Sequence, residues 1–252
     1  MKLSDIKKLQ QKKYRTQFDS YLLEGEHLIL ELKKAALTQA YLKQATIYFS
    51  ETHRPLAQKL SNDFNVVQVD TKQMAGLSNT KNPQGILACV PMPKAVTVSD
   101  HYAKQPCVYL HEIQDPGNLG TIIRTLAWFG DFRLLLSKNS VDPFNPKVIR
   151  ASMGAIFHVP IEQEVSLDDL HNRFDKFAYL DMEGKSINSA AFFEYKCYLF
   201  GNEARGVPLS ELTGCRAEPF NIEGSGNIDS LNVASAVNIC VYELSKNKAS
   251  KR

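Results

Sequence analysis

The sequence predicts an α/β protein of two modules, the second of which contains a parallel sheet with helices on its faces. Short apolar runs alternate with helix-like stretches from Cys107 onward. Pro91 and Pro93 interrupt both helix and strand pairing and mark a linker before that point. Charge is also divided: residues 1–95 carry 14 Lys+Arg against 8 Asp+Glu, whereas residues 96–252 carry 16 against 19. We therefore expect one domain at 1–95 and another at 96–252.

The first module is expected to begin with a basic helix over residues 1–17. A solvated helix face and a phosphate-binding surface explain its cations equally well: Lys7, Lys8, Lys12, Lys13 and Arg15. Residues 18–34 read as a strand or turn that enters an amphipathic helix, because Leu28 and Leu32 recur at helical spacing. Further short elements follow, with strands expected at 45–49, 65–69 and 85–90 and a helix at 55–60.

In the second module, strands and helices are expected in alternation along the chain. The strands are 107–110, 133–136, a segment near 177–180 and 197–200, and the helices are 118–129 and a segment near 146–153. On the helix 118–129, four apolar residues share one face at 100° per residue: Leu119, Ile122, Ile123 and Leu126. Arg124 projects near the opposite side with Trp128, so packing does not require an arginine at this position.

Two glycine loops end the chain's last apolar runs. Gly201 and Gly206 follow the strand 197–200, and Gly224 and Gly226 follow a short apolar piece around Ile222. The second loop is expected to enter a helix at residues 229–230. Such loops leave backbone groups free to bind a small ligand, although ordinary strand-to-loop turns would give the same pattern.

Composition indicates a cytoplasmic globular protein with no membrane segment. Of the 252 residues 44% are hydrophobic and 23% charged, and no run reaches the roughly 20 apolar residues that a membrane helix needs. The basic N-terminus has no apolar core behind it, so it is not a secretory signal. Five scattered cysteines without a CxxC or Cys/His cluster predict neither a disulfide framework nor a metal site.

Three motifs stand in order along the second module. The first is Asn118, Gly120 and Arg124 on a helix that ends in Phe-Gly; the second is FGxExxG, from Phe200 to Gly206; the third is Ile222, a glycine loop and the run SLNV at 230–233. Together they resemble the signature of the SpoU (TrmH) family of RNA ribose methyltransferases. Two positions depart from the common third motif: Glu223-Gly224 stands where Pro-Met is usual, and Ala234 where Ser is common.

This resemblance implies methyl transfer from S-adenosylmethionine to a ribose 2′-hydroxyl of structured RNA, either ribosomal or transfer RNA. It also implies a homodimer and a catalytic domain with a trefoil knot. The domain before it would be a small α/β substrate-binding module akin to RNA-binding ribosomal proteins. The implied cofactor-binding residues are Gly201, Asn202, Glu203, Ile222 and Leu231, and the implied catalytic residues are Arg124, Asn118, Glu203, Ser230 and Asn232, without a metal.

In the family, the arginine at the position of Arg124 acts on the hydroxyl as a base or places the target phosphate. A guanidinium has a pKa above about 12, which makes it a poor base, so we favour phosphate clamping and electrostatic activation. The family also pairs this arginine with a cofactor held by the loops of the neighbouring subunit. Arg150 is expected to contact either RNA phosphate or a structural carboxylate, and His158 to be a packed strand residue.

Two other functions compete with this interpretation. A nucleotide-dependent oxidoreductase is suggested by DPGNLG after a strand, but the sequence lacks GxGxxG, since Gly117 and Gly120 have no third glycine at the right place. A non-catalytic RNA-binding protein is suggested by the basic first module. An antibiotic-resistance role within the same methylation chemistry also remains open.

Overall fold

The computed structural model describes residues 1–94 and 105–249, which form two compact units. The first unit contains Met1–Lys94 and also Asp142–His158, and the rest of the described chain forms the second. The boundary expected at 95/96 lies outside the described residues. The second module was expected to contain residues 142–158, so their place in the first unit departs from the predicted division.

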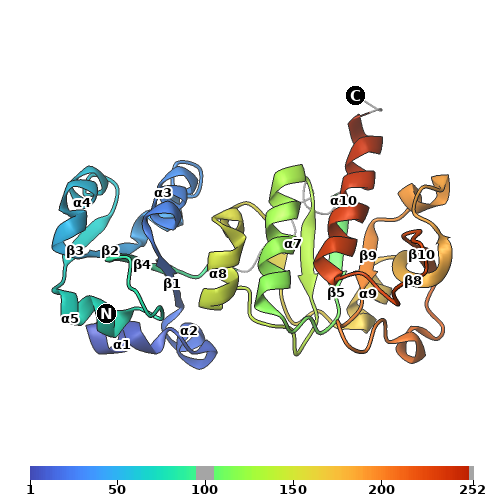
Figure 1. Ribbon diagram of the computed structural model, residues 1–252, viewed down its shortest axis with the longest axis horizontal. Coiled ribbons are helices and arrows are strands. Elements are labelled where there is room, and N and C mark those ends of the chain that lie inside the picture. Colours follow the sequence, from blue (N-terminus) through green and yellow to red (C-terminus); the bar gives the residue numbers. More distant parts are fainter. Residues whose placement is uncertain (95–104, 250–252) are drawn as a thin grey trace. The chain divides into compact units, whose positions relative to one another are not determined.

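The first unit contains a four-stranded sheet in the order β1-β4-β2-β3 (Figure 1). The strand β4 (Ile86–Pro91) runs antiparallel to β1 (Ser20–Glu24) and β2 (Thr46–Phe49), and β2 is parallel to β3 (Asn65–Gln68). The strands predicted from the sequence are thereby confirmed to within a residue at each end. The accompanying helices are α1 (Leu3–Lys8), α2 (Lys12–Phe18), α3 (Glu26–Ala35), α4 (Arg54–Leu60) and α5 (Thr71–Leu77), with short 3-10 turns at Ala40–Gln44 and Glu51–His53.

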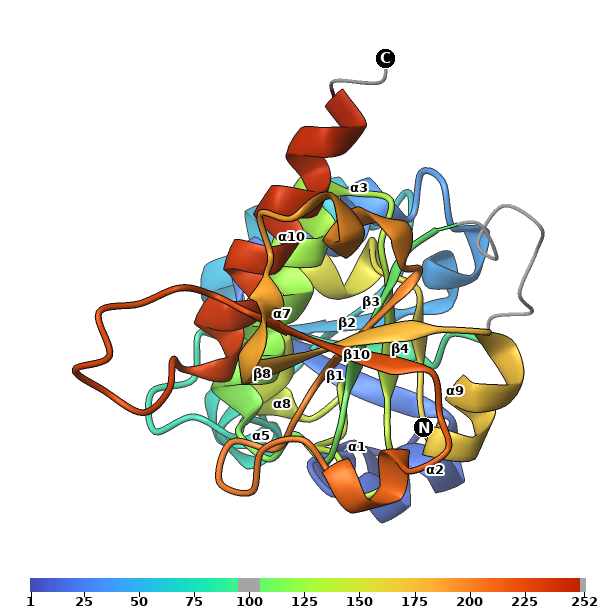
Figure 2. The same ribbon diagram turned by 90° about the vertical axis from the view of Figure 1, so that its right-hand side faces the viewer.

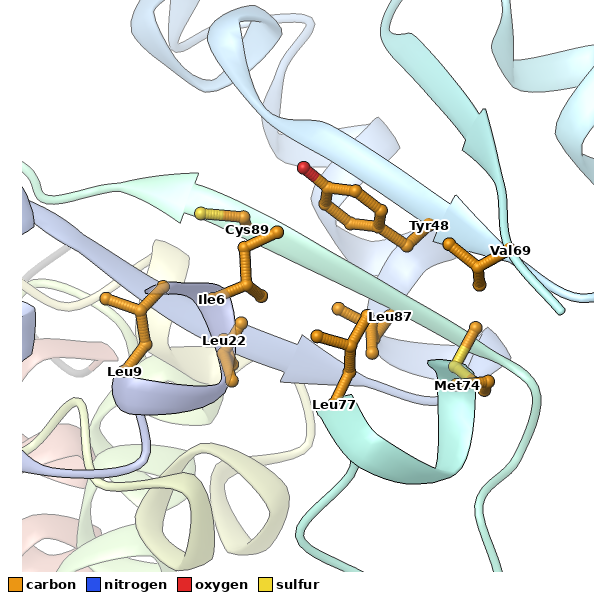
Figure 3. Packing of buried hydrophobic residues seen from close by; sticks show 9 residues of the cluster. All are labelled: Ile6, Leu9, Leu22, Tyr48, Val69, Met74, Leu77, Leu87 and Cys89. Atoms are coloured by element: carbon orange, nitrogen blue, oxygen red, sulfur yellow. The ribbon is translucent and has the colours of Figure 1, made fainter. Parts of the chain in front are cut away.

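One face of this sheet is covered by α1 and α5. Figure 3 shows Ile6 of α1, Leu9 just after it, and Met74 and Leu77 of α5 pointing toward the apolar side chains of the strands, Leu22, Tyr48, Leu87 and Cys89. The single basic helix expected over 1–17 is therefore wrong in detail. The chain forms two short helices separated by residues 9–11, and Ile6 and Leu9 are buried.

The segment 142–158 completes the first unit. It contains α8 (Pro146–Ser152) and a 3-10 turn (Ala155–Phe157). The ring of Phe144 lies 4.9 Å from that of Tyr21 between centroids, and Gln39 Nε2 donates to the carbonyl of Phe157 at 2.6 Å. His158 follows this turn and is exposed, so its expected place in a strand is wrong.

The second unit contains a six-stranded sheet in the order β10-β8-β9-β5-β6-β7. Every neighbouring pair is parallel, which confirms the predicted parallel sheet. The strands are β5 (Cys107–Leu110), β6 (Arg133–Leu136), β7 (Ile161–Glu162), β8 (Phe177–Ser186), β9 (Cys197–Phe200) and β10 (Ala217–Asn221).

The helices α7 (Pro116–Phe129) and α10 (Val233–Ala249) lie side by side in both ribbon views (Figures 1 and 2). The predicted apolar face of α7 is confirmed, because Leu119, Ile122 and Ile123 are fully buried and Leu126 nearly so. Leu170 of α9 (Leu167–Arg173) packs in a second apolar cluster with Tyr109, Phe177 and Leu199 of the strands. Two further 3-10 turns, Ala190–Glu194 and Leu209–Leu212, complete the unit.

Two boundaries in the second unit differ from the predictions. The helix α10 begins at Val233 and not at 229–230, since Asn232 supplies the side chain that caps it. The strand β8 is longer than expected, and near its end it lies against β10. A Cβ at Gly184 would lie 2.3 Å from the backbone nitrogen of Phe220, so this approach requires glycine.

In the part of the chain that the structure describes, no helix has the length and apolar character to cross a membrane.

Candidate active site at the carboxyl edge of the second sheet

The loops after β5 and β9 meet the first turn of α7 at one edge of the parallel sheet. Parallel strands present their carboxyl ends at the same edge, which is the usual ligand-binding edge of such sheets. The loop after β5 is residues 111–115, and the loop after β9 is 201–206. The first turn of α7 is capped by Asp115, whose carboxylate accepts the N–H of Asn118 at 2.7 Å.

Glu203 joins the loop after β9 to the start of α7. Its carboxylate accepts the backbone N–H groups of Gln114 (3.2 Å) and Asp115 (3.1 Å) and the side-chain amide of Asn118 (3.3 Å). A carboxylate is favourable at a helix N-terminus, where unpaired N–H groups and the helix dipole carry partial positive charge. Glu203 therefore fixes the first motif against the second.

Asn118 in turn contacts the third motif. Its Oδ1 accepts a hydrogen bond from Asn232 Nδ2 at 2.9 Å. Oδ1 of Asn232 accepts the backbone N–H of Ala234 at 2.9 Å and so caps α10. A continuous chain of hydrogen bonds thus runs from Glu203 through Asn118 to Asn232, and it brings all three sequence motifs to one place.

The loop 201–206 is closed by its own backbone. Asn202 and Gly206 exchange N–H···O=C bonds of 3.0 and 2.9 Å, and Oδ1 of Asn202 accepts the N–H groups of Ala204 and Arg205. At Gly201 a Cβ would lie 2.1 Å from the carbonyl carbon of Gly206, so any side chain at Gly201 would open this turn. The need for glycine there comes from the loop itself.

Residues 223–231 form an extended loop whose side chains are all exposed. No backbone group of these residues hydrogen bonds to another residue within the ranges that the structure describes. Ile222 is half-buried at the end of β10, Leu231 is 45% exposed, and Ser230 is exposed. Free N–H and C=O groups beside two apolar side chains fit a ligand with polar edges and an apolar body, such as an adenosine cofactor.

Arg124 lies apart from this hydrogen-bonded chain. It is exposed and makes no hydrogen bond or ion pair within the described part of the chain. Six residues separate it from Asn118, which corresponds to roughly 9 Å along the helix and about 120° around it. The structure thus brings together four of the predicted site residues, Asn118, Asn202, Glu203 and Asn232. Arg124 is exposed on its helix, and Ser230 and Leu231 lie exposed in the loop 223–231.

Several polar residues at this edge were not predicted from the sequence. Glu112 pairs with Arg205, and its carboxylate also accepts Asn139 Nδ2 at 3.0 Å. The hydrogen bond from Asn139, and then the nearby Arg205 charge, lower the pKa of Glu112, so the group is ionised at neutral pH. Burial lowers the pKa of the adjacent His111, which is therefore neutral. Glu112, His111 and Asn139 lie outside the three motifs, and Arg205 occupies an unspecified position of the second motif, so the motifs gave no signal for them.

Comparison with known proteins gives two family matches. A model of the SpoU rRNA Methylase family matches residues 105–242, and a model of the MRM3-like substrate binding domain matches residues 1–88. The 23S rRNA (guanosine(2553)-2′-O)-methyltransferase RlmP of Bacillus subtilis is 30% identical over 254 residues, covering 96% of this chain and 95% of its own.

Two further relatives extend the comparison. An uncharacterized tRNA/rRNA methyltransferase of Synechocystis is 32% identical over 249 residues, covering 96% of this chain and 89% of its own. The crystal structure of an AdoMet-bound rRNA methyltransferase from Sinorhizobium meliloti superposes with a TM-score of 0.77 at 27% identity, covering 97% of this chain and 94% of the other. The motifs, the hydrogen bonds that join them and these matches agree, and the chain belongs to the SpoU rRNA methylase family.

Proposed function

We propose that this protein transfers a methyl group from S-adenosylmethionine to a ribose 2′-hydroxyl in RNA. The observation that carries the proposal is the hydrogen-bonded chain Glu203–Asn118–Asn232, which joins the three family motifs at the ligand-binding edge of the sheet. Ribosomal RNA is the favoured substrate over transfer RNA, because RlmP of Bacillus subtilis is named for 23S rRNA and the mouse relative, 33% identical over 165 residues, is named mitochondrial rRNA methyltransferase 3.

S-adenosylmethionine supplies a methyl group on a positively charged sulfur, which is already activated toward a nucleophile. The protein must hold that methyl group in line with the ribose oxygen and favour loss of the hydroxyl proton. In our proposal the backbone of Gly201 and Asn202, with Ile222 and Leu231, holds the cofactor, and Ser230 lies beside it. This assignment is supported by the free backbone groups of residues 223–231.

Arg124 is proposed to clamp the RNA phosphate next to the target ribose. Its guanidinium can bind phosphate through two parallel hydrogen bonds, and its exposure leaves it available to a ligand. Asn118 and Glu203 are proposed to fix the start of the helix that carries Arg124, and Asn232 to fix α10 beside it. No step in this mechanism requires a metal.

We further propose that the first unit binds the RNA and that the protein acts in the cytoplasm as a homodimer with a knotted catalytic domain. The match of residues 1–88 to a substrate-binding domain supports the first part. Exposed aromatic side chains support a dimer interface on the neighbouring helices α7 and α10. Trp128 of α7 is 84% exposed, and Tyr242 of α10 is 50% exposed. Family membership supports the knot.

The test is methyl transfer by the purified protein to ribosomal RNA from cells that lack it, with radiolabelled cofactor and ribose-methylation mapping. Incorporation at one 2′-hydroxyl is expected from wild type. The Arg124→Ala variant should lose roughly 100- to 1,000-fold in turnover, while calorimetry finds nearly unchanged cofactor affinity. Methylation of a base, or none with any cellular RNA, would refute the proposed reaction. Loss of cofactor binding in Arg124→Ala would refute the role given to that residue.

A further inference from the structure

Glu112 lies two residues after the end of β5 and has an unusual backbone. Its φ is +48°, in the left-handed region that side chains with a Cβ rarely adopt and that favours glycine and asparagine. A left-handed glutamate persists only where its surroundings hold it. Its position at the carboxyl edge of the sheet, three residues before the cap of α7, makes those surroundings relevant to the active site.

Glu112 contacts three separate loops. Its N–H donates to Ser137 Oγ (2.7 Å) in the loop after β6. Its carbonyl accepts Asn202 Nδ2 (2.7 Å) from the loop after β9 and Gln114 Nε2 (3.0 Å) from its own loop. Its carboxylate accepts Asn139 Nδ2 at 3.0 Å and pairs with Arg205. Every polar group of this one residue is thus used to join the loops after β5, β6 and β9.

The contact with Asn202 orients the whole turn 201–206. With its amide nitrogen held by the carbonyl of Glu112, Asn202 turns its Oδ1 toward the N–H groups of Ala204 and Arg205. That arrangement places Glu203, the next residue, where it accepts from Gln114, Asp115 and Asn118. A shift of the Glu112 backbone would therefore be transmitted through Asn202 to Glu203.

We infer that Glu112 is a positioning residue that holds the turn 201–206 in the shape that binds the cofactor. The inference rests on the proposed function for the cofactor and on the contacts above for the geometry. Within the described residues, Glu112 makes no hydrogen bond or ion pair with the open loop 223–231 or with Arg124, so its effect passes through Asn202 and Arg205.

The ion pair of Glu112 with Arg205 is expected to order the turn 201–206 without adding much to the stability of the fold. Arg205 is 69% exposed, and an exposed pair adds little to the stability of a fold. What the pair does restrain is a six-residue turn that otherwise faces solvent. We expect substitution of Glu112 to loosen this turn while the unit stays folded.

The matched experiment compares Glu112→Gly with Glu164→Gly. Both are glutamates with a left-handed backbone, φ +48° and +61°, so both substitutions relax the backbone and remove one carboxylate. Hydrogen exchange of the amides 202–206 and calorimetric affinity for S-adenosylmethionine are measured for both. Glu112→Gly should speed exchange in the turn and weaken cofactor binding by about 10- to 100-fold, because small misplacements at such sites have effects of that size. Glu164→Gly should do neither.

A conservative change refines the test. Both Glu112→Gln and Glu112→Gly keep the backbone bonds to Ser137 and Asn202. Glu112→Gln also keeps a side-chain acceptor for Asn139 and loses only the charge opposite Arg205, so its effect should fall between wild type and Glu112→Gly. Unchanged exchange of 202–206 in Glu112→Gly, or equal effects of Glu164→Gly, would overturn the inference. If wild type bound no S-adenosylmethionine, the proposed function would fail, and the exchange measurement would still decide the role of Glu112.

Discussion

Arg15 and Asp142 form an ion pair inside the first unit, with side chains only 2% and 8% exposed. Arg15 Nε donates to Asp142 Oδ2 at 2.9 Å, and Nη1 donates to the carbonyls of Leu9 and Gln10 at 2.9 and 3.0 Å. Oδ1 of Asp142 accepts the N–H of Phe144. Both charges are thus satisfied, which buried ions require. The pair fastens the segment 142–158 to the rest of the unit.

We expect Arg15→Met to lower the free energy of unfolding of the first unit by about 3–5 kcal/mol, because Asp142 is left as an unpaired buried charge. The double variant Arg15→Met/Asp142→Leu should recover most of this stability. Urea unfolding of each variant measures both effects. The exposed pair Arg216–Asp175 is the control, and Arg216→Met should change the free energy by less than about 1 kcal/mol. A small effect of Arg15→Met would show that the pair contributes little.

Arg15 and Arg124 show which features of a residue can be predicted from the sequence and which cannot. Arg15 stood among four lysines and was grouped with them as a candidate phosphate contact, yet its partner is 127 residues away along the chain. No local pattern reveals such a partner. Arg124 was predicted to project away from the apolar face of its helix, and its exposure confirms this, because helical periodicity is local information.

At the scale of elements, regular strands and the amphipathic helix α7 were predictable because burial imposes a period on their side chains. The start of α10 was not, since it depends on a cap: Asn232 follows a glycine loop that carries no period. The segment 142–158 contains the helix that was expected, but its assignment to the first unit depends on contacts with Arg15, Tyr21 and Gln39.

Asn232 is predicted to serve both α10 and the active site, and two substitutions separate these roles. Asn232→Ala removes the cap and should lower the free energy of unfolding by about 1 kcal/mol. Asn232→Asp keeps a capping oxygen at the helix N-terminus but cannot donate to Asn118. It should therefore unfold like wild type yet turn over more slowly. Thermal unfolding and methyl-transfer rates measure the two effects. Equal turnover in Asn232→Asp and wild type would argue against a role for the bond to Asn118.

The helices α1 and α2 are predicted to contact RNA phosphate through their exposed lysines, Lys7, Lys8, Lys12 and Lys13. The Nζ atoms of Lys8 and Lys13 each lie 5.7 Å from the ring of Tyr14, so cations and an aromatic face are combined. Changing the four lysines to Gln should weaken RNA binding and flatten its salt dependence. Each substituted lysine that binds a phosphate should reduce the magnitude of the slope of log K, the RNA association constant, against log salt concentration by roughly 0.7–0.9.

The control for this test changes four other lysines of the same unit, Lys33, Lys34, Lys43 and Lys59, to Gln, with the same change of charge. A similar reduction of slope in both variants would indicate unspecific attraction and contradict a binding surface on α1 and α2. Substitution is a cleaner test than removal of residues 1–95, because that truncation would strip Asp142 and Phe144 of their partners Arg15 and Tyr21.

At the scale of the whole molecule, Arg124 makes no hydrogen bond or ion pair with the loops 201–206 and 223–231 of its own chain within the described residues. Glu203 and Asn232 meet at the first turn of α7, whereas Arg124 lies nearly two turns farther along and faces another direction. A symmetric dimer solves this if Arg124 of one protomer reaches the loops of its partner. The exposed Trp128 lies one turn beyond Arg124, so an interface covering it would bring Arg124 near a second chain.

The shared site predicts complementation between two inactive variants. Homodimers of Arg124→Ala lack the phosphate clamp, and homodimers of Gly201→Trp lack the cofactor turn, because even a Cβ at Gly201 would lie 2.1 Å from the carbonyl carbon of Gly206. In a mixed dimer, purified through two different tags, one site combines the intact arginine with the intact turn, and the other collects both defects. Up to about half of wild-type methyl transfer should return, as two-fold symmetry requires. If each site instead took Arg124 and Gly201 from the same chain, every site would carry one fatal defect. A folded mixed dimer without activity would therefore refute the shared site, and recovery at half the wild-type rate cannot arise from any arrangement within one protomer.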